Sequence, residues 1–91
     1  MEYNILHNEA ASRFEVVVEG LLSLVDYKEV NDTFVVTHTE VPKELEGRGI
    51  AAALTKVLLD FVRASGKKVR PVCPYTKAYL QRHPEYEDIL V

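Results

Sequence analysis

The chain has 91 residues, of which 47% are hydrophobic, and a formal net charge of −3 at pH 7. A chain of this length buries one modest core, so we expect a single domain over residues 1–91 and no second module. The acidic balance argues against a general nucleic-acid-binding protein, no apolar run approaches the roughly 18 residues of a membrane span, and no signal-peptide pattern opens the chain, so we predict a cytoplasmic protein.

The N-terminal half has the composition of a β-sheet. We predict four strands, over residues 3–7, 14–18, 21–30 and 33–41. Phe14, Val16 and Val18 alternate with other residues in the second, and β-branched side chains are dense in the fourth. Turn residues lie between the strands, which favours antiparallel hairpins, and Pro42 ends the series.

A helix is predicted from Ile50 to Ser65. Apolar residues recur there at helical spacing and form one stripe, made of Ile50, Leu54, Val57, Leu58, Phe61 and Val62. Thr55 lies off this stripe, which predicts an exposed side chain. Gly66 followed by two lysines is a typical helix end.

A short strand over residues 68–73 and a second helix beginning at Pro74 complete the prediction. A strand, a helix and another strand form a βαβ unit, so residues 33–41 and 69–72 should run parallel with a right-handed connection. Pro71 removes a ladder donor from the last strand, which favours strands that separate and leave a gap for a ligand. The fold class is therefore α/β (α+β), a mostly antiparallel sheet with one parallel pair and two main helices.

The turn before the first helix combines Gly47, Arg48 and Gly49. Bare backbone amides at a helix N-terminus beside a fixed positive charge favour an anion such as a phosphate. The alternative is that the two glycines only shape a loop, which is the better interpretation of an isolated Gly-x-Gly.

The segment Glu46-Gly47-Arg48-Gly49-Ile50-Ala51 resembles the Gln/Arg-x-x-Gly-x-Gly/Ala motif of the GNAT N-acetyltransferase superfamily, matching it at Gly49 and Ala51 and departing from it at Glu46. The Pro-Val-Cys-Pro-Tyr and His-Pro-Glu-Tyr segments extend the resemblance over nearly the whole chain, to a family of stand-alone minimal GNAT-like proteins. The resemblance implies an N-acetyltransferase that uses acetyl-coenzyme A as co-substrate.

The same resemblance implies where the coenzyme lies. Its pyrophosphate would sit on the glycine turn and its pantetheine would run beside the end of the long strand; the implied binding residues are Val41, Gly47, Arg48, Gly49, Ile50, Ala51, Ala52 and Tyr75. The chain is too short for the helices and strands that usually shape the acceptor pocket. An open acceptor side fits a protein or peptide amine, or a site completed by a partner such as a second copy in a homodimer.

Three residues could take part in catalysis. Cys73, the single cysteine, precedes a helix that can lower its pKa, or it is a small buried hydrophobe. Tyr79 stands where the superfamily often places the acid that protonates the coenzyme thiolate, or it packs in the core. Tyr75 is the second choice for that acid. Glu40 could be the general base for the amine, or a solvated strand residue.

His38 could assist Glu40, because strict alternation would place both on one face with Phe34 and Val36. A satisfied half-buried histidine is the other interpretation of His38. No spacing of Cys, His, Asp or Glu suggests a metal site.

The sequence thus predicts an acetyl-coenzyme A-dependent N-acetyltransferase. Two alternatives stay open: a non-catalytic coenzyme A-binding or regulatory module, and an interaction domain whose glycine turn binds nothing.

Overall fold

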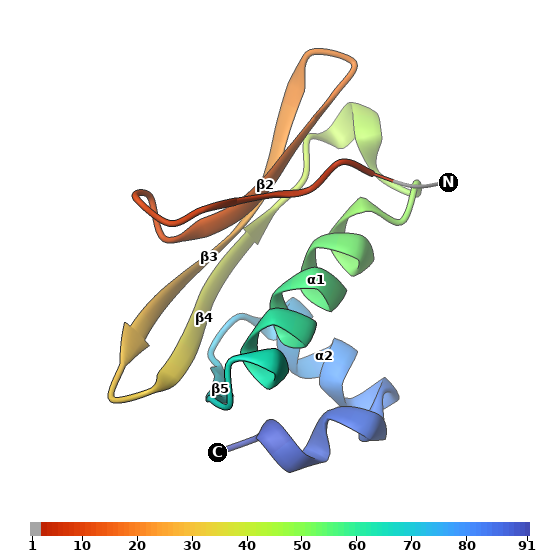
Figure 1. Ribbon diagram of the computed structural model, residues 1–91. Helices are drawn as coiled ribbons and strands as arrows, with labels where there is room; N and C mark the ends of the chain where they lie inside the picture. The colour runs from red at the N-terminus through yellow and green to blue at the C-terminus, as the bar shows by residue number, and fades with distance from the viewer. Residues whose placement is uncertain (1–2) are drawn as a thin grey trace.

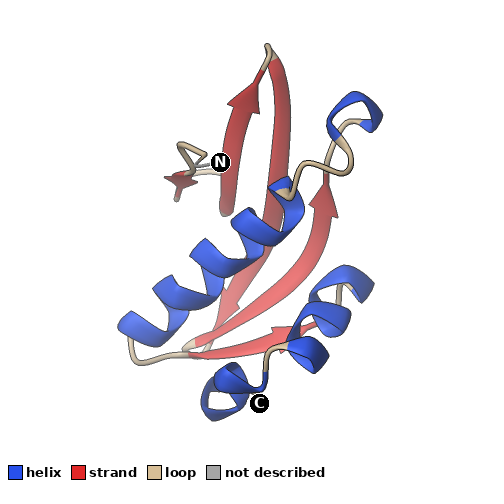
Figure 2. Cartoon of the chain, turned by 90° about the vertical axis from the view of Figure 1, so that its right-hand side faces the viewer, coloured by secondary structure: helices blue, strands red, loops and turns tan. Residues whose placement is uncertain are grey.

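The computed structural model describes residues 3–91, which form one five-stranded sheet with two helices on one side (Figures 1 and 2). The elements in chain order are β1 (Leu6–Asn8), β2 (Arg13–Val18), β3 (Leu21–Val30), β4 (Thr33–Glu40), the 3-10 helix η1 (Lys43–Leu45), α1 (Ile50–Ala64), β5 (Lys68–Pro71), α2 (Pro74–Arg82) and the 3-10 helix η2 (Pro84–Ile89). The predicted α+β class is confirmed.

The strands follow one another in the sheet in chain order, β1 to β5. The pairs from β1 to β4 are antiparallel, as the hairpin turns predict, and β4 and β5 are parallel. The predicted first strand was placed too early: β1 covers Leu6–Asn8, which pair with residues 13–15 of β2.

A β-bulge interrupts the pairing of β3 and β4. Asp26 pairs with His38 and Tyr27 with Val36, so Thr37 is an extra residue on β4. Its hydroxyl donates to the Asp26 carbonyl oxygen at 3.4 Å. At the bulge two residues of β4 lie opposite one residue of β3. Beyond it, each side chain of β4 therefore points to the face opposite to the one that strict alternation predicts.

The prediction that His38 shares a face with Phe34 and Val36 is therefore wrong. Phe34 and Val36 are buried toward α1, whereas His38 and Glu40 are exposed. Thr39 takes the inward place, because it pairs with Val25, which is fully buried.

The predicted βαβ unit is present, and its two strands separate as the proline indicates. Pairing of β4 with β5 ends at Val36 and Pro71, while β4 continues to Glu40. The carbonyl oxygen of Val36 accepts from the amides of both Val72 and Cys73, at 2.9 and 3.0 Å. The last four residues of β4 consequently have no partner strand on the β5 side.

Helix α1 packs across the inner face of the sheet (Figure 1). Its buried residues are Ile50, Leu54, Thr55, Leu58, Leu59 and Val62. The predicted stripe was thus rotated slightly: Thr55 is buried, with its hydroxyl donating to the Ala51 carbonyl at 2.8 Å, while Val57 is exposed. Phe61 packs edge-on against Phe14 and Phe34 beneath the far end of the helix.

The last residues form η2, where the sequence predicted only a short tail. Arg63 of α1 pairs with Asp88 at 2.6 Å, and the Tyr86 hydroxyl donates to Asp60 at 2.7 Å. The amide of Val91 donates to the Val69 carbonyl at 3.1 Å. This segment therefore extends the edge of the sheet beside β5 and closes the core below α2.

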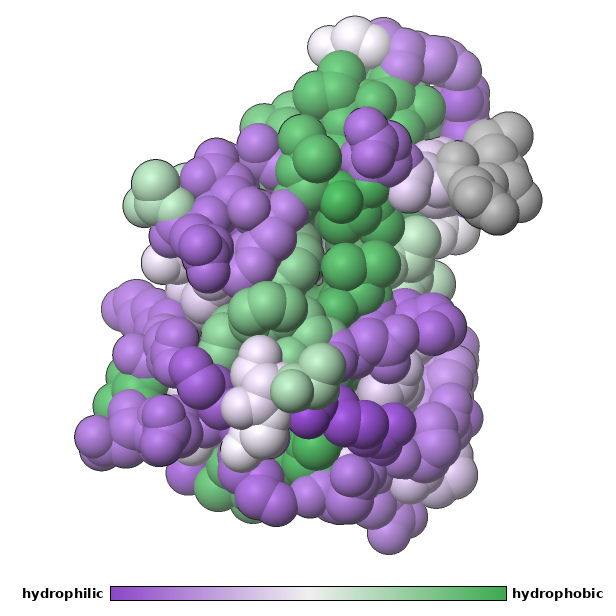
Figure 3. Space-filling view, viewed as in Figure 1, coloured by the Kyte–Doolittle hydropathy of each residue, from purple (hydrophilic) through white to green (hydrophobic). Residues whose placement is uncertain are grey.

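The face of the sheet away from α1 carries no helix among residues 3–91 (Figure 2). Val17, Leu22 and Leu6 are exposed there, and Figure 3 shows hydrophobic residues gathered over the β2–β3 hairpin at the top of the view. None of the described helices combines the length and apolar character that crossing a membrane requires.

Candidate functional site

The turn formed by Gly47, Arg48 and Gly49 leads into α1 and leaves the N-terminus of this helix without a side-chain cap. Gly47 and Gly49 have φ values of 84° and 75°, a left-handed conformation that favours glycine, and Gly49 is the N-cap of the helix. No side chain caps this end. The first amide N–H groups of α1 therefore have no partner within the helix and can bind an anion.

A cavity of about 220 Å³ lies on this turn. It is lined by Val41, Leu45, Gly47, Gly49, Ile50, Ala51, Ala52 and Tyr75. Every predicted coenzyme-binding residue except Arg48 is in this set. The structure thus brings together residues from the end of β4, the turn, α1 and the first turn of α2. Leu45 was missed because it belongs to η1, which the sequence did not predict.

Arg48 points instead to the β2–β3 hairpin, where its guanidinium pairs with the carboxylate of Glu19. The Tyr3 hydroxyl donates to the Arg48 carbonyl oxygen at 2.6 Å. The hydrogen bond that Arg48 donates to Glu19, and then the negative charge of Glu19, raise the pKa of Arg48 above its ordinary value. The cation predicted beside the phosphate is therefore already paired with an anion of the protein.

Cys73 lies at the N-cap of α2 and is buried. Its Sγ is 3.5 Å from Thr39 Oγ1. Burial alone would raise the pKa of the thiol. Hydrogen bonds from the Thr39 hydroxyl and from the amides of Thr76 and Tyr75 outweigh it, and the net pKa lies below its ordinary value.

Thr76 adds a second hydroxyl beside this thiol. Its Oγ1 is fully buried and has no hydrogen-bond partner among the described residues. That hydroxyl can donate to the Cys73 thiolate, which further lowers the pKa. Sequence reasoning missed this residue; its position, three residues after a helix N-cap, was the available signal.

Glu40 and His38 lie on the opposite face of β4 from Thr39. Their side chains are 64% and 56% exposed, and His38 Nε2 is 3.2 Å from Glu40 Oε1. The structure thus brings Cys73 to the inner side of the strand end and leaves the predicted base on the outer side.

Tyr79 lies in a groove between α1 and α2, stacked on His83 with ring centroids 3.9 Å apart. Burial raises the pKa of its hydroxyl above the ordinary value. The nearby charges that affect this pKa come from Lys56, Asp60 and Glu85, so the hydroxyl lies toward the middle of α1.

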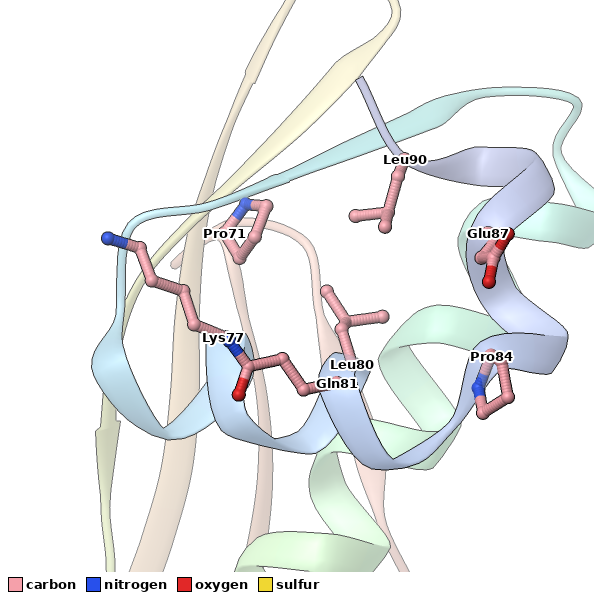
Figure 4. A pocket seen from close by; sticks show the side chains of 7 residues that line it. All are labelled: Pro71, Lys77, Leu80, Gln81, Pro84, Glu87 and Leu90. Carbon is pink, nitrogen blue, oxygen red and sulfur yellow. The ribbon is translucent and has the colours of Figure 1, made fainter.

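Another cavity, of about 570 Å³, lies between β5, α2 and η2 (Figure 4) and is larger than the cavity on the glycine turn. Leu80 and Leu90 point into it from opposite sides, with Pro71 and Pro84 at its ends. None of the catalytic or coenzyme-binding residues predicted from the sequence lines this cavity. Among residues 3–91 no group of His, Cys, Asp or Glu could hold a metal ion.

Known proteins resemble this chain in sequence and in fold. Residues 13–89 match the model of the GCN5-related N-acetyl-transferase family. Protein NATD1 from mouse is 35% identical over 81 residues, which cover 86% of this chain and 74% of that protein. For human Protein NATD1 the identity is also 35%, over 89% of this chain and 61% of that protein.

A solved structure also resembles this fold. The solution structure of a GCN5-like candidate N-acetyltransferase from Staphylococcus aureus superimposes with a TM-score of 0.78 and 25% sequence identity. The match covers 98% of this chain and 88% of that one, so the likeness extends over the sheet and both helices.

Proposed function

Because the chain belongs to the GCN5-related N-acetyltransferase family, we propose that it binds acetyl-coenzyme A and transfers the acetyl group to an amine. The observation that carries the proposal is the cavity on the glycine turn, where unpaired helix amides meet seven of the eight residues predicted to bind the coenzyme. Such an arrangement suits a pyrophosphate.

In this proposal the amides from Gly47 to Ala52 hold the pyrophosphate. Val41 and Tyr75 line the same cavity and would contact the pantetheine. The end of β4 that lacks a partner strand leads from there to Thr39 and Cys73. The residues present fit the coenzyme, since bare amides, small side chains and one aromatic ring meet at the turn.

The proposed chemistry is direct transfer. Glu40 accepts a proton from the acceptor amine, whose nitrogen then bonds to the acetyl carbon. Tyr79 donates a proton to sulfur as the carbon–sulfur bond breaks, so that coenzyme A leaves as the thiol. The phenol of Tyr79 carries a proton at neutral pH, as a general acid must, and burial, which raises its pKa, makes it a weaker acid.

Cys73 offers a covalent route as the smaller alternative. Its thiolate would attack the acetyl carbon and release coenzyme A, and the amine would then take the acetyl group from Cys73. The lowered pKa of the thiol supports this route.

We further propose a protein or peptide as the acceptor. Glu40 and His38 are exposed on the sheet face that no described helix covers, so a large acceptor meets no obstruction there. A second copy of the chain could instead cover this face through Val17 and Leu22, giving a homodimer. Sedimentation analysis distinguishes the two, since a homodimer doubles the mass without any acceptor.

A non-catalytic coenzyme-binding module is the second candidate. It is favoured by the positions of Glu40 and Tyr79, which lie on opposite sides of β4 rather than facing one another. This candidate predicts tight binding of acetyl-coenzyme A without turnover.

Titration with acetyl-coenzyme A, followed by mass spectrometry of the protein and of candidate amines, tests the proposal. Gly49→Val should abolish binding, because its side chain would project into the space over the amides. Gly66→Val is the matched control: its φ of 71° imposes the same backbone strain at the other end of α1. If Gly49→Val bound acetyl-coenzyme A with the same affinity as Gly66→Val, the turn would not be the pyrophosphate site.

A further inference from the structure

The cavity of about 570 Å³ between β5, α2 and η2 is suited to an apolar side chain. Leu80 and Leu90 face one another across it, and Pro71 and Pro84 lie at its two ends (Figure 4). Ligand sites in proteins typically combine such an apolar lining with a few polar groups, in a volume of roughly 300–1,000 Å³. The cavity therefore has room for a leucine-sized side chain and part of the backbone that carries it.

Two opposite charges lie at the rim of this cavity. Figure 4 shows Lys77 on the side of Pro71 and Glu87 on the side of Pro84. Both side chains are exposed, and neither forms an ion pair with any residue from 3 to 91. A ligand that carries an acid at one end and a base at the other is therefore complementary to the rim, whereas a ligand of uniform charge is repelled at one end.

The end of the cavity at Pro71 and Lys77 is close to the point where β4 and β5 separate. Cys73 follows Pro71 by two residues, which is at most about 7 Å along the chain. The Lys77 amide donates to the Cys73 carbonyl oxygen at 3.1 Å, so Lys77 lies one helical turn beyond Cys73. Val72 lies between Pro71 and Cys73 and is 51% exposed. A polypeptide that leaves the cavity at this end can thus run over Val72 toward the unpaired end of β4.

We propose that this cavity anchors the acceptor polypeptide, an inference that depends on the function proposed above. A leucine-sized side chain of the acceptor enters between Leu80 and Leu90. An acidic side chain two residues away meets Lys77, and a basic side chain two residues away on the other side meets Glu87. Alternate residues of an extended segment share one face at a spacing of about 7 Å, so the three side chains reach the cavity together.

The geometry also orders the acceptor sequence. Because Lys77 is at the end of the cavity nearest Cys73, the acidic residue of the acceptor lies between the leucine and the amine that receives the acetyl group. The basic residue lies beyond the leucine, at the Glu87 end. The cavity meets side chains only, so the chain direction of the acceptor is left to the test.

The test uses synthetic peptides with blocked ends and one lysine each. The anchored peptide is Lys-Gly-Gly-Glu-Gly-Leu-Gly-Arg, made in this order and in reverse, and the plain peptide has serine in place of the glutamate, leucine and arginine. With acetyl-coenzyme A, the better anchored peptide should have a KM about tenfold lower than the plain peptide at a similar kcat, because the anchor acts in binding alone. Fluorescence anisotropy with labelled peptides should give the same ratio of dissociation constants.

Charge reversal identifies the site of binding. Lys77→Glu should raise the KM of the anchored peptide about fivefold, and replacement of the peptide's glutamate by arginine should restore it, as expected for an exposed ion pair. Lys28→Glu makes the same change of charge at an exposed position on β3 and should behave like the wild type. Circular dichroism should show that both variants fold, since both side chains are exposed.

The outcomes separate the inference from its premise. Equal KM values and affinities for the anchored and plain peptides, or an equal loss in Lys28→Glu, would overturn the anchor while acetyl transfer stands. If the anchored peptide bound but neither peptide were acetylated, the proposed transfer would fail, and with it the role of the cavity in holding an acceptor. A dimer in sedimentation analysis that Lys77→Glu dissociates would assign the cavity to a second copy of the chain and overturn the inference.

Discussion

Replacement of Glu19 by Gln should tighten coenzyme binding. Glu19 forms an ion pair with Arg48 in the glycine turn, and a bound pyrophosphate would compete for that guanidinium. In Glu19→Gln the arginine no longer has an anionic partner in the protein. One negative charge near the cavity is also removed, which lowers the repulsion of an anionic ligand.

The magnitude follows from exposure. The side chains of Arg48 and Glu19 are 40% and 63% exposed, so water screens the pair, and pairs of this kind contribute little. We therefore expect the dissociation constant for coenzyme A to fall by roughly two- to fivefold at low salt. At about 1 M salt the Debye length is close to 3 Å, and the difference between variant and wild type should disappear.

Calorimetric titration at low and high salt checks this expectation. Glu15→Gln is the control, because it removes the same charge from β2 without touching Arg48. Weaker binding by Glu19→Gln would show that the ion pair holds the turn in a binding shape rather than competing with the ligand. If Glu15→Gln increased the affinity for coenzyme A by the same factor, the effect would come from the change in net charge and not from the release of Arg48.

Three further outcomes are expected. Tyr79→Phe should lower kcat severalfold and leave the dissociation constant of acetyl-coenzyme A unchanged, because only the proposed proton donor is lost; unchanged turnover would assign Tyr79 to packing. The ultraviolet absorbance of the Cys73 thiolate, measured against Cys73→Ala, should titrate below the ordinary thiol pKa of 9.0, and Thr39→Val should move the midpoint upward; a midpoint at or above the ordinary value would contradict the hydrogen bonds. Leu54→Ala should reduce the free energy of unfolding by about 2–5 kcal/mol in urea, since Leu54 is fully buried under the sheet, and a smaller loss would mean that the core collapses around the gap.

Most of the sheet could be predicted from the sequence. Local turn residues and β-branched runs mark β2, β3 and β4 within one or two residues of their bounds. The parallel pair followed from the order strand, helix, strand, and the separation from Pro71. The left-handed turn before α1 followed from Gly47 and Gly49, because its geometry is local to the backbone.

The errors share a physical cause, which is that they depend on packing or pairing at a distance. Strict alternation placed His38 inward, but pairing with β3 inserts Thr37 and turns it outward. Because Thr55 lies off the apolar stripe of α1, the sequence predicted an exposed side chain. Its hydroxyl donates to the backbone of its own helix, which allows the side chain to be buried. The partner of Arg48 is Glu19, 29 residues away, and no local pattern indicates it.

The extra residue in β4 gives one strand two independent surfaces. Thr39 faces Cys73, and the residues on either side of it face the uncovered side of the sheet. Substitutions at positions 38 and 40 can therefore change what approaches from outside without disturbing the inner wall. An insertion or deletion at position 37 would exchange the two surfaces at once, so this position is where a designer should keep the chain length fixed and vary only its neighbours.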